Sequence, residues 1–117
     1  MFDMRACVEF LDYEDGKPTQ ILLLESLVWL PIPITVPAGF ISDGASIPRW
    51  AWRAIGHPFD ARWIRSALLH DYLCRTRKLS SRETHDLFYK TMRWEKNSWL
   101  RATMMRAAVV VANPEWP

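Results

Sequence analysis

The segment LLHDYL (residues 68–73) places an imidazole and a carboxylate side by side in an otherwise apolar helical run. A carboxylate in such a setting needs a partner that offsets the loss of its hydration. A second polar stretch, FISDGASIP (residues 40–48), carries Asp43 and Ser46, which are the nearest candidates for that partner. Because packing alone would choose apolar side chains at these places, the two segments together indicate a site.

The chain before these segments has the pattern of strands. Residues 5–12 alternate roughly between apolar and polar side chains, and the Asp-Gly pair in residues 13–18 indicates a turn after them. Residues 19–30 predict a second strand or a strand pair. The prolines around residues 34–36 oppose an interior strand, so we expect a short edge segment there.

From residue 48 onward the apolar residues recur at helical spacing. Residues 80–83, SSRE, form a capping box that predicts the start of a helix. We expect four helices, over residues 48–55, about 60–76, about 80–97 and about 98–111. This order of elements predicts a single α+β domain of residues 1–117, with a small antiparallel N-terminal sheet (residues 1–47, mainly strands and a loop) packed against three to four C-terminal helices (residues 48–117).

Composition narrows the class of protein. Cys7 and Cys74 have no CxxC or Cys/His spacing, so we expect no structural zinc site, and free buried thiols in preference to a disulfide. Residues 1–5 begin no apolar signal segment, and the apolar run at residues 107–112 is too short to span a bilayer. We therefore expect a protein made in the cytoplasm, without a transmembrane segment.

Charge and aromatic residues are unevenly distributed along the chain. Residues 1–47 carry seven acids and two basic residues, a balance of about −5, so the rest carries about +7. No nucleic-acid reading motif accompanies this positive charge, and we expect no nucleic-acid partner. Six of the seven tryptophans follow residue 43. Some of them should anchor a core or a protein interface.

The polar residues allow three kinds of site. Asp43, His70, Asp71 and Asp86 would form an oxygen-rich group with one imidazole, which could hold a divalent metal and a reactive water. Asp43, His70 and Asp71 could instead work with Ser46 or Ser42 in a serine–histidine–aspartate arrangement, although no nucleophile elbow surrounds either serine. The catalytic candidates are therefore Asp43, Ser46, His70 and Asp71, and whether the protein is an enzyme stays open.

A purely structural role is the third possibility. His70 would then be a core histidine, and Asp43 would cap its own loop. Asp86 would pair with Arg82 at helical spacing. Successive helical residues point about 100° apart, so His70 and Asp71 cannot both face one direction. Asp71 has three candidate partners: Arg49, Arg65 and Arg75.

The strings VPAGFISDGASIP (residues 36–48) and ALLHDYL (residues 67–73), followed by Arg82 and Asp86, resemble the DUF1353 family. The likeness covers about residues 34–93. The family consists of small proteins of phages and prophage-bearing bacteria, of unknown function, so the resemblance implies a phage-encoded protein and no established activity. The family has a small residue before the aspartate, which makes His85 a poor candidate for a shared site and Asp86 a better one.

Three functional hypotheses follow. The first is a phage structural or accessory protein, associated with the virion tail, in which Asp43, His70 and Asp71 form a buried polar clamp. The second is a small metal-dependent hydrolase acting on the cell wall. The third is an adaptor or inhibitor that binds a protein through a tryptophan-rich surface. For the first we expect other phage proteins or a second copy as partners, and incorporation into the virion.

Overall fold

The structure is a computed structural model, and it describes the chain except for residues 3–5, 15–16, 31, 45–46, 48–49, 52–56 and 58 and the side chains of residues 12–14 and 17–18. Within these bounds it shows strands followed by helices: β1 Val8–Glu14, β2 Lys17–Leu23, β3 Leu27–Trp29, β4 Ile34–Val36, β5 Ile41–Ser42, α2 Ile64–Thr76, α3 Ser81–Trp94 and α4 Trp99–Ala112. The predicted α+β class is confirmed.

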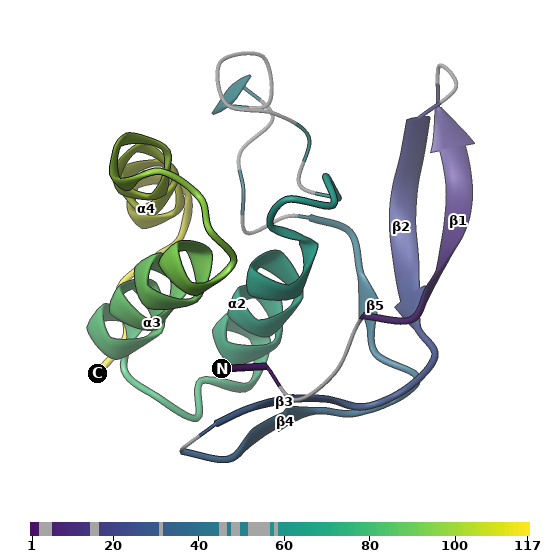
Figure 1. The fold of residues 1–117 in the computed structure, drawn as a ribbon, viewed down its shortest axis with the longest axis horizontal. Coiled ribbons are helices and arrows are strands. Elements are labelled where there is room, and N and C mark those ends of the chain that lie inside the picture. The colour runs from purple at the N-terminus through teal and green to yellow at the C-terminus, as the bar shows by residue number, and fades with distance from the viewer. Residues whose placement is uncertain are drawn as a thin grey trace.

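The strands form two small antiparallel sheets. One has the order β1-β2-β5 and the other pairs β3 with β4. In β2 the alternate residues Ile21 and Leu23 are fully buried, as expected for a strand with one face on a core. Figure 1 shows the β1–β2 hairpin standing away from the helices, whereas β3 and β4 pass beneath α2. The residues predicted as a strand pair, 19–30, thus contribute to two different sheets.

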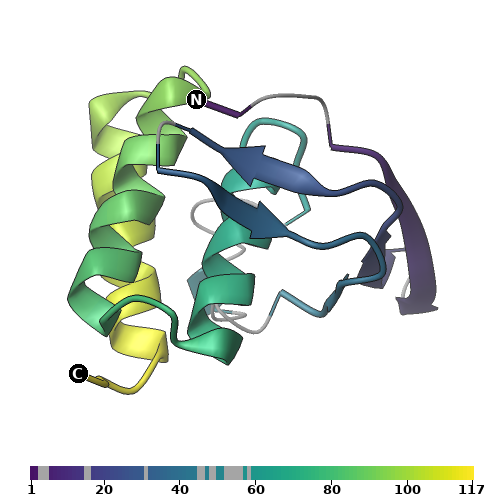
Figure 2. The ribbon, with the colours of Figure 1, turned by 90° about the horizontal axis from the view of Figure 1, so that it is seen from below.

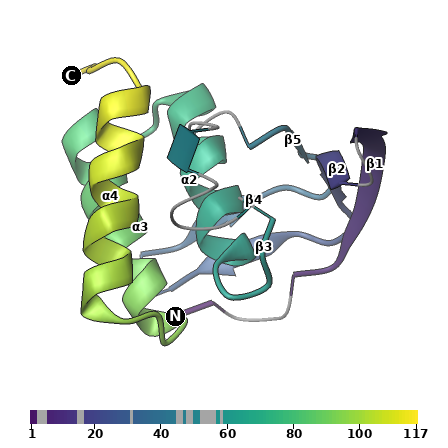
Figure 3. The same ribbon diagram turned by 90° about the horizontal axis from the view of Figure 1, so that it is seen from above.

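The three long helices lie side by side, with α3 between α2 and α4. Figure 2, from below, shows β3 and β4 beside α2 and α3, and Figure 3 shows α4 on the far side from the sheets. Ser80 and Glu83 form the predicted capping box at the start of α3. Ser98 accepts a hydrogen bond from the Arg101 amide at the start of α4.

Two apolar cores hold these layers together. The first joins both sheets to α2 through residues such as Leu23, Trp29 and Leu69. The second lies among the helices and includes Trp63 and Phe88, both almost fully buried. α2 contributes to both cores, which explains why its middle turns are buried on every side. A polar side chain in those turns must therefore find its partner inside the protein.

Some predicted boundaries shift in the structure. α2 begins at Ile64 and not near residue 60, because the Asp60 carboxylate accepts the Arg62 amide at 2.9 Å and forms a local turn. α3 ends at Trp94 and not near residue 97, because Lys96 adopts a left-handed conformation with φ of 70°. The predicted helix over residues 48–55 falls mostly outside the described residues, within which Trp50 and Ala51 are helical.

The cysteines are unbridged, and the helices are too short to span a membrane in the part of the chain that the structure describes. Cys7 and Cys74 are free thiols, as predicted, although both are half-buried and not fully buried. Among the helices that the structure describes, none has the length and apolar character needed to cross a membrane.

Candidate functional site

Arg75 joins β5 to α2. Its guanidinium donates to the Ile41 carbonyl at 2.6 Å and to Asp43 Oδ1 at 3.3 Å, and it lies 3.2 Å from Asp71 Oδ2. Asp71 and Arg75 are one turn apart on α2, whereas Asp43 follows β5 directly. Ser42 belongs to the same group because its hydroxyl bonds the Asp71 carboxylate. We call Ser42, Asp43, Asp71 and Arg75 the Arg75 clamp.

The Asp71 carboxylate is the buried member of the Arg75 clamp. Its side chain is 4% exposed, whereas that of Asp43 is 48% exposed. Burial raises the pKa of Asp71, and the Ser42 hydrogen bond and the Arg75 charge oppose that rise. Ser42 also accepts the Gly44 amide at 3.3 Å, which fixes the start of the loop after β5. The clamp therefore fastens this loop to α2 through a buried carboxylate whose charge is offset by Arg75.

His70 lies on another side of α2 and is not part of the Arg75 clamp. Its Nε2 atom is 2.9 Å from Nδ1 of His85, and its ring packs against Phe88 on α3. The Cys74 sulfur is 3.7 Å from both ring nitrogens. Complete burial, and then the charge of His85, lower the pKa of His70 to about 3. His70 is thus a neutral core histidine that joins α2 to α3, as the 100° argument allowed.

The relation between His85 and Asp86 is the reverse of the expectation. His85 is buried and contacts His70, whereas Asp86 points to α4 and pairs with Arg106. The expected pair of Asp86 with Arg82 is replaced by this contact between helices. Asp86 was expected to be the better candidate for a shared site, but in the structure His85, and not Asp86, reaches His70. The expectation relied on the family pattern, whereas the facing surfaces of α2 and α3 decide which residue reaches His70.

The structure brings together only part of the group expected to bind a metal. Asp43 and Asp71 share Arg75, while His70 and Asp86 have partners on α3 and α4. Within the described ranges, no group of three histidine, cysteine, aspartate or glutamate side chains is placed to hold a metal ion. Ser46, the fourth catalytic candidate, and Arg49, a candidate partner of Asp71, lie outside the described residues. The geometry of the described residues favours the clamp.

A second buried polar group, around Glu95, was not predicted from the sequence. The Glu95 carboxylate, 2% exposed, accepts hydrogen bonds from the Ser66 amide at 2.9 Å, the Ser66 hydroxyl and Arg65 Nε at 3.0 Å. The residue at the N-cap position of α2, Trp63, makes no side-chain cap hydrogen bond. Glu95 thus caps α2 from the end of α3, and it places negative charge at a helix N-terminus where the backbone dipole favours it.

Burial and hydrogen bonding have opposite effects on the Glu95 carboxylate. Burial raises the pKa of Glu95, while the bonds from Ser66 and Arg65 lower it. Asn97 makes a further hydrogen bond between the same two regions, since its side-chain amide donates to the Arg62 carbonyl at 2.8 Å. No local sequence signal distinguishes Glu95 from an exposed glutamate, since its partners lie about thirty positions earlier in the chain.

The buried histidine predicts a pH dependence. The pKa of His70 in the folded protein, about 3, lies below its ordinary value of 6.5, so below pH 6.5 the unfolded chain binds a proton that the folded chain does not. We expect this contribution to stability to be complete above pH 6.5 and to fall by about 1.4 kcal/mol per pH unit towards pH 3. The lowered pKa of His85 acts in the same direction.

Urea unfolding of the wild type and His70→Gln from pH 8 to pH 5 measures this effect. Asp71 and Glu95 have raised pKa values and contribute the opposite slope, because their stabilisation is present at low pH and is lost as pH rises through the folded pKa. Both groups remain in the variant, so the difference between the two proteins isolates the histidine. Parallel curves for the two proteins between pH 7 and pH 5 would contradict the expectation.

The fold and the Arg75 clamp define a small α+β protein whose buried polar residues join a short strand to a central helix. The chain belongs to the family described as "Protein of unknown function (DUF1353)", whose model matches residues 30–109. This range is wider than the predicted 34–93, and it contains the Arg75 clamp, His70 and Glu95. The resemblance identified from the sequence is confirmed.

Two relatives come from Sinorhizobium fredii strain NGR234. The uncharacterized protein y4jT is 38% identical over 81 residues, which cover 69% of this chain and 24% of the relative. The uncharacterized protein y4iH is 35% identical over 75 residues, which cover 64% of this chain and 31% of the relative. The matched part thus spans less than a third of either relative. No solved structure gives a significant match to the chain.

Proposed function

We propose that this chain is a non-catalytic structural or accessory protein that acts by binding another protein, and that it is phage-encoded and associated with the virion tail. One observation carries the binding role, namely the exposed apolar side of α4. The phage and tail assignment is supported by the resemblance of the sequence motifs alone. The Arg75 clamp fits this role because it joins secondary-structure elements and leaves its one buried acid paired with Arg75.

The outward side of α4 is apolar although it faces solvent. Leu100, Met104 and Val111 are 58%, 43% and 73% exposed and lie at positions i, i+4 and i+11 of the helix. Ala102 and Met105, on the opposite side, are fully buried in the helical core. A soluble helix ordinarily presents polar residues on its outward side. We call the exposed residues Leu100, Met104 and Val111 the α4 strip.

Charge indicates the kind of partner that the α4 strip would take. Helix α4 contains no acid, and its two charged residues are Arg101 and Arg106. Arg106 is paired with Asp86, which leaves Arg101 as the cation beside the strip. A partner that matches this surface presents an apolar ridge with an acidic side chain beside it. We propose such a protein, from the same assembly, as the occupant of the strip. The cell-wall hydrolase hypothesis has less support, because His70 and Asp71 face different elements and do not form one site.

Incorporation into phage particles tests this proposal. We expect the tagged wild-type protein to copurify with particles induced from the strain that carries the gene, in a fixed ratio to a major tail protein. The double variant Leu100→Glu and Val111→Glu should be absent from the particles while its melting temperature changes by less than about 2 °C, since both residues are exposed. Quantitative mass spectrometry of gradient-purified particles measures the ratio.

Ile32→Glu is the matched control. Ile32 is 69% exposed and apolar, but it lies between β3 and β4, outside α4. This variant should enter particles at the wild-type ratio. Absence of the wild-type protein from particles contradicts the virion assignment, and equal incorporation of the double variant contradicts the role of the α4 strip.

A further inference from the structure

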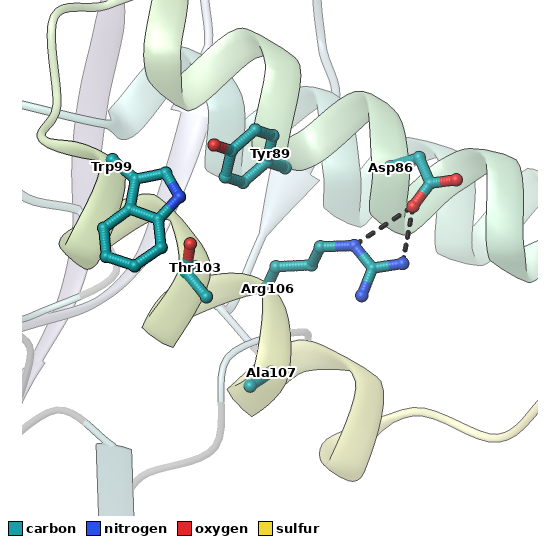
Figure 4. A pocket seen from close by; sticks show the side chains of 6 residues that line it. All are labelled: Asp86, Tyr89, Trp99, Thr103, Arg106 and Ala107. Carbon is teal, nitrogen blue, oxygen red and sulfur yellow. Dashed lines mark hydrogen bonds and ion pairs between the residues drawn. The ribbon is translucent and has the colours of Figure 1, made fainter.

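A groove of about 510 Å³ runs between α3 and α4, next to the α4 strip. Figure 4 shows the residues that line it, which are Asp86, Tyr89, Trp99, Thr103, Arg106 and Ala107. Its volume lies within the range of small-molecule sites, roughly 300–1,000 Å³. None of these residues belongs to the Arg75 clamp or the α4 strip. The groove thus offers a surface that the proposed function does not use.

The two ends of the groove differ in chemistry. At one end the Trp99 indole is 62% exposed, with the Tyr89 ring beside it (Figure 4). At the other end Arg106 donates to Asp86 through Nε, at 3.1 Å, and through a terminal nitrogen, both to the same oxygen, Oδ1. The Arg106 side chain is 37% exposed and the Asp86 side chain is 56% exposed, so solvent and ligands can reach both.

Charge and backbone geometry exclude several kinds of ligand. Asp86 and Arg106 neutralise each other, so the groove has no net charge with which to hold an anion or a cation. Helices α3 and α4 use their backbone groups internally, so the walls offer no edge to which a peptide strand could add. The remaining polar groups form hydrogen bonds in fixed directions, since each member of the ion pair holds the other in place.

A neutral polyhydroxyl ring matches these features. A pyranose has one apolar face of C–H groups, which stacks on an exposed indole, and hydroxyl groups around its edge, which both donate and accept. The Asp86 carboxylate can accept from such hydroxyls, and the Arg106 guanidinium and the Thr103 hydroxyl can donate to them. We propose that the groove between α3 and α4 is a saccharide-binding site in which one sugar ring stacks on Trp99 and its hydroxyl groups bond Asp86 and Arg106.

Titration of the ¹⁵N-labelled full chain with three neutral oligosaccharides tests the proposal: maltotriose, cellotriose and tri-N-acetylchitotriose. We expect at least one of them to shift the Trp99 indole N–H resonance with saturation in the millimolar range. Trp99→Ala should weaken that binding at least tenfold, and Asp86→Asn should weaken it at least threefold. Binding should be unchanged by 0.5 M NaCl, because a neutral ligand is not attracted by screened charges.

Trp50→Ala is the matched control, since Trp50 is 64% exposed and lies outside the groove. It should bind the same sugar as tightly as the wild type. Three outcomes overturn the proposal: no shift with any of the three sugars at 10 mM, equal weakening by Trp50→Ala and Trp99→Ala, or loss of binding in high salt. The proposal rests on the groove alone, so its failure leaves the role of the α4 strip unaffected.

Discussion

Glu95→Ala is expected to lower the free energy of unfolding by about 3–4 kcal/mol, the largest effect of any single substitution considered for this chain. The variant leaves the Ser66 amide without its acceptor at the start of α2, and it leaves Arg65 without its acid. Both losses occur where Glu95 is almost fully buried. Removing one partner of a buried charged pair is costly because the other groups stay desolvated.

Chemical denaturation with urea, followed by circular dichroism, measures this effect. Glu115→Ala is the matched control because Glu115 is exposed and lies beyond α4, and its change should stay within about 0.5 kcal/mol. Glu95→Gln keeps an oxygen that can accept a hydrogen bond from Ser66. Its free energy of unfolding should lie between those of Glu95→Ala and Glu115→Ala. A free energy of unfolding for Glu95→Ala within 1 kcal/mol of that for Glu115→Ala would show that Glu95 does not cap α2.

The second large effect is expected at the Arg75 clamp. Arg75→Ala should lower the free energy of unfolding by about 2–3 kcal/mol at pH 7, because the buried Asp71 carboxylate loses its cation and β5 loses its bond at Ile41. The expected cost is below that of a fully buried pair because the Arg75 side chain is 44% exposed. Water can therefore replace part of the interaction that Asp71 loses with Arg75. Asp71→Asn should cost about 2 kcal/mol.

A double-mutant cycle measures the interaction energy between Asp71 and Arg75 separately from the other contacts of each residue. Asp71→Asn and Arg75→Ala together should cost less than the sum of the single changes, by about 1 kcal/mol or more, because each removes the same contact. Asp43→Asn is the internal control, since Asp43 is half-exposed, and it should cost less than about 1 kcal/mol. Additive effects of the two substitutions would contradict a direct role of Arg75 in holding Asp71.

The sequence predicted those parts of the fold that depend on neighbouring residues. The capping box at Ser80 and Glu83 marks the start of α3 because its donors and acceptors are three positions apart. The separation of His70 from Asp71 also followed from helix geometry alone. These features need no knowledge of how distant segments pack, and the structure has both of them.

The pairs between distant residues could not be predicted in this way. Asp71 had three candidate arginines, and only the packing of β5 on α2 favours Arg75, which reaches Ile41 and Asp43 at once. Which of His85 and Asp86 contacts His70 depends on which side of α3 faces α2, and the family pattern carries no information on that packing. Glu95 gave no signal at all, because its role exists only when the end of α3 lies beside the start of α2.

We propose that the Asp71 carboxylate and its neighbours stabilise the fold and do not serve a metal centre. The most direct test is a thermal melt of the wild type and Asp71→Asn, first with chelator and then with zinc, manganese, magnesium or calcium. We expect Asp71→Asn to melt roughly 5–10 °C below the wild type under every condition, with no rise in the wild type on adding any metal. A metal-specific rise of several degrees in the wild type, lost in an Asp71→Asn protein that otherwise melts at the wild-type temperature, would contradict the claim.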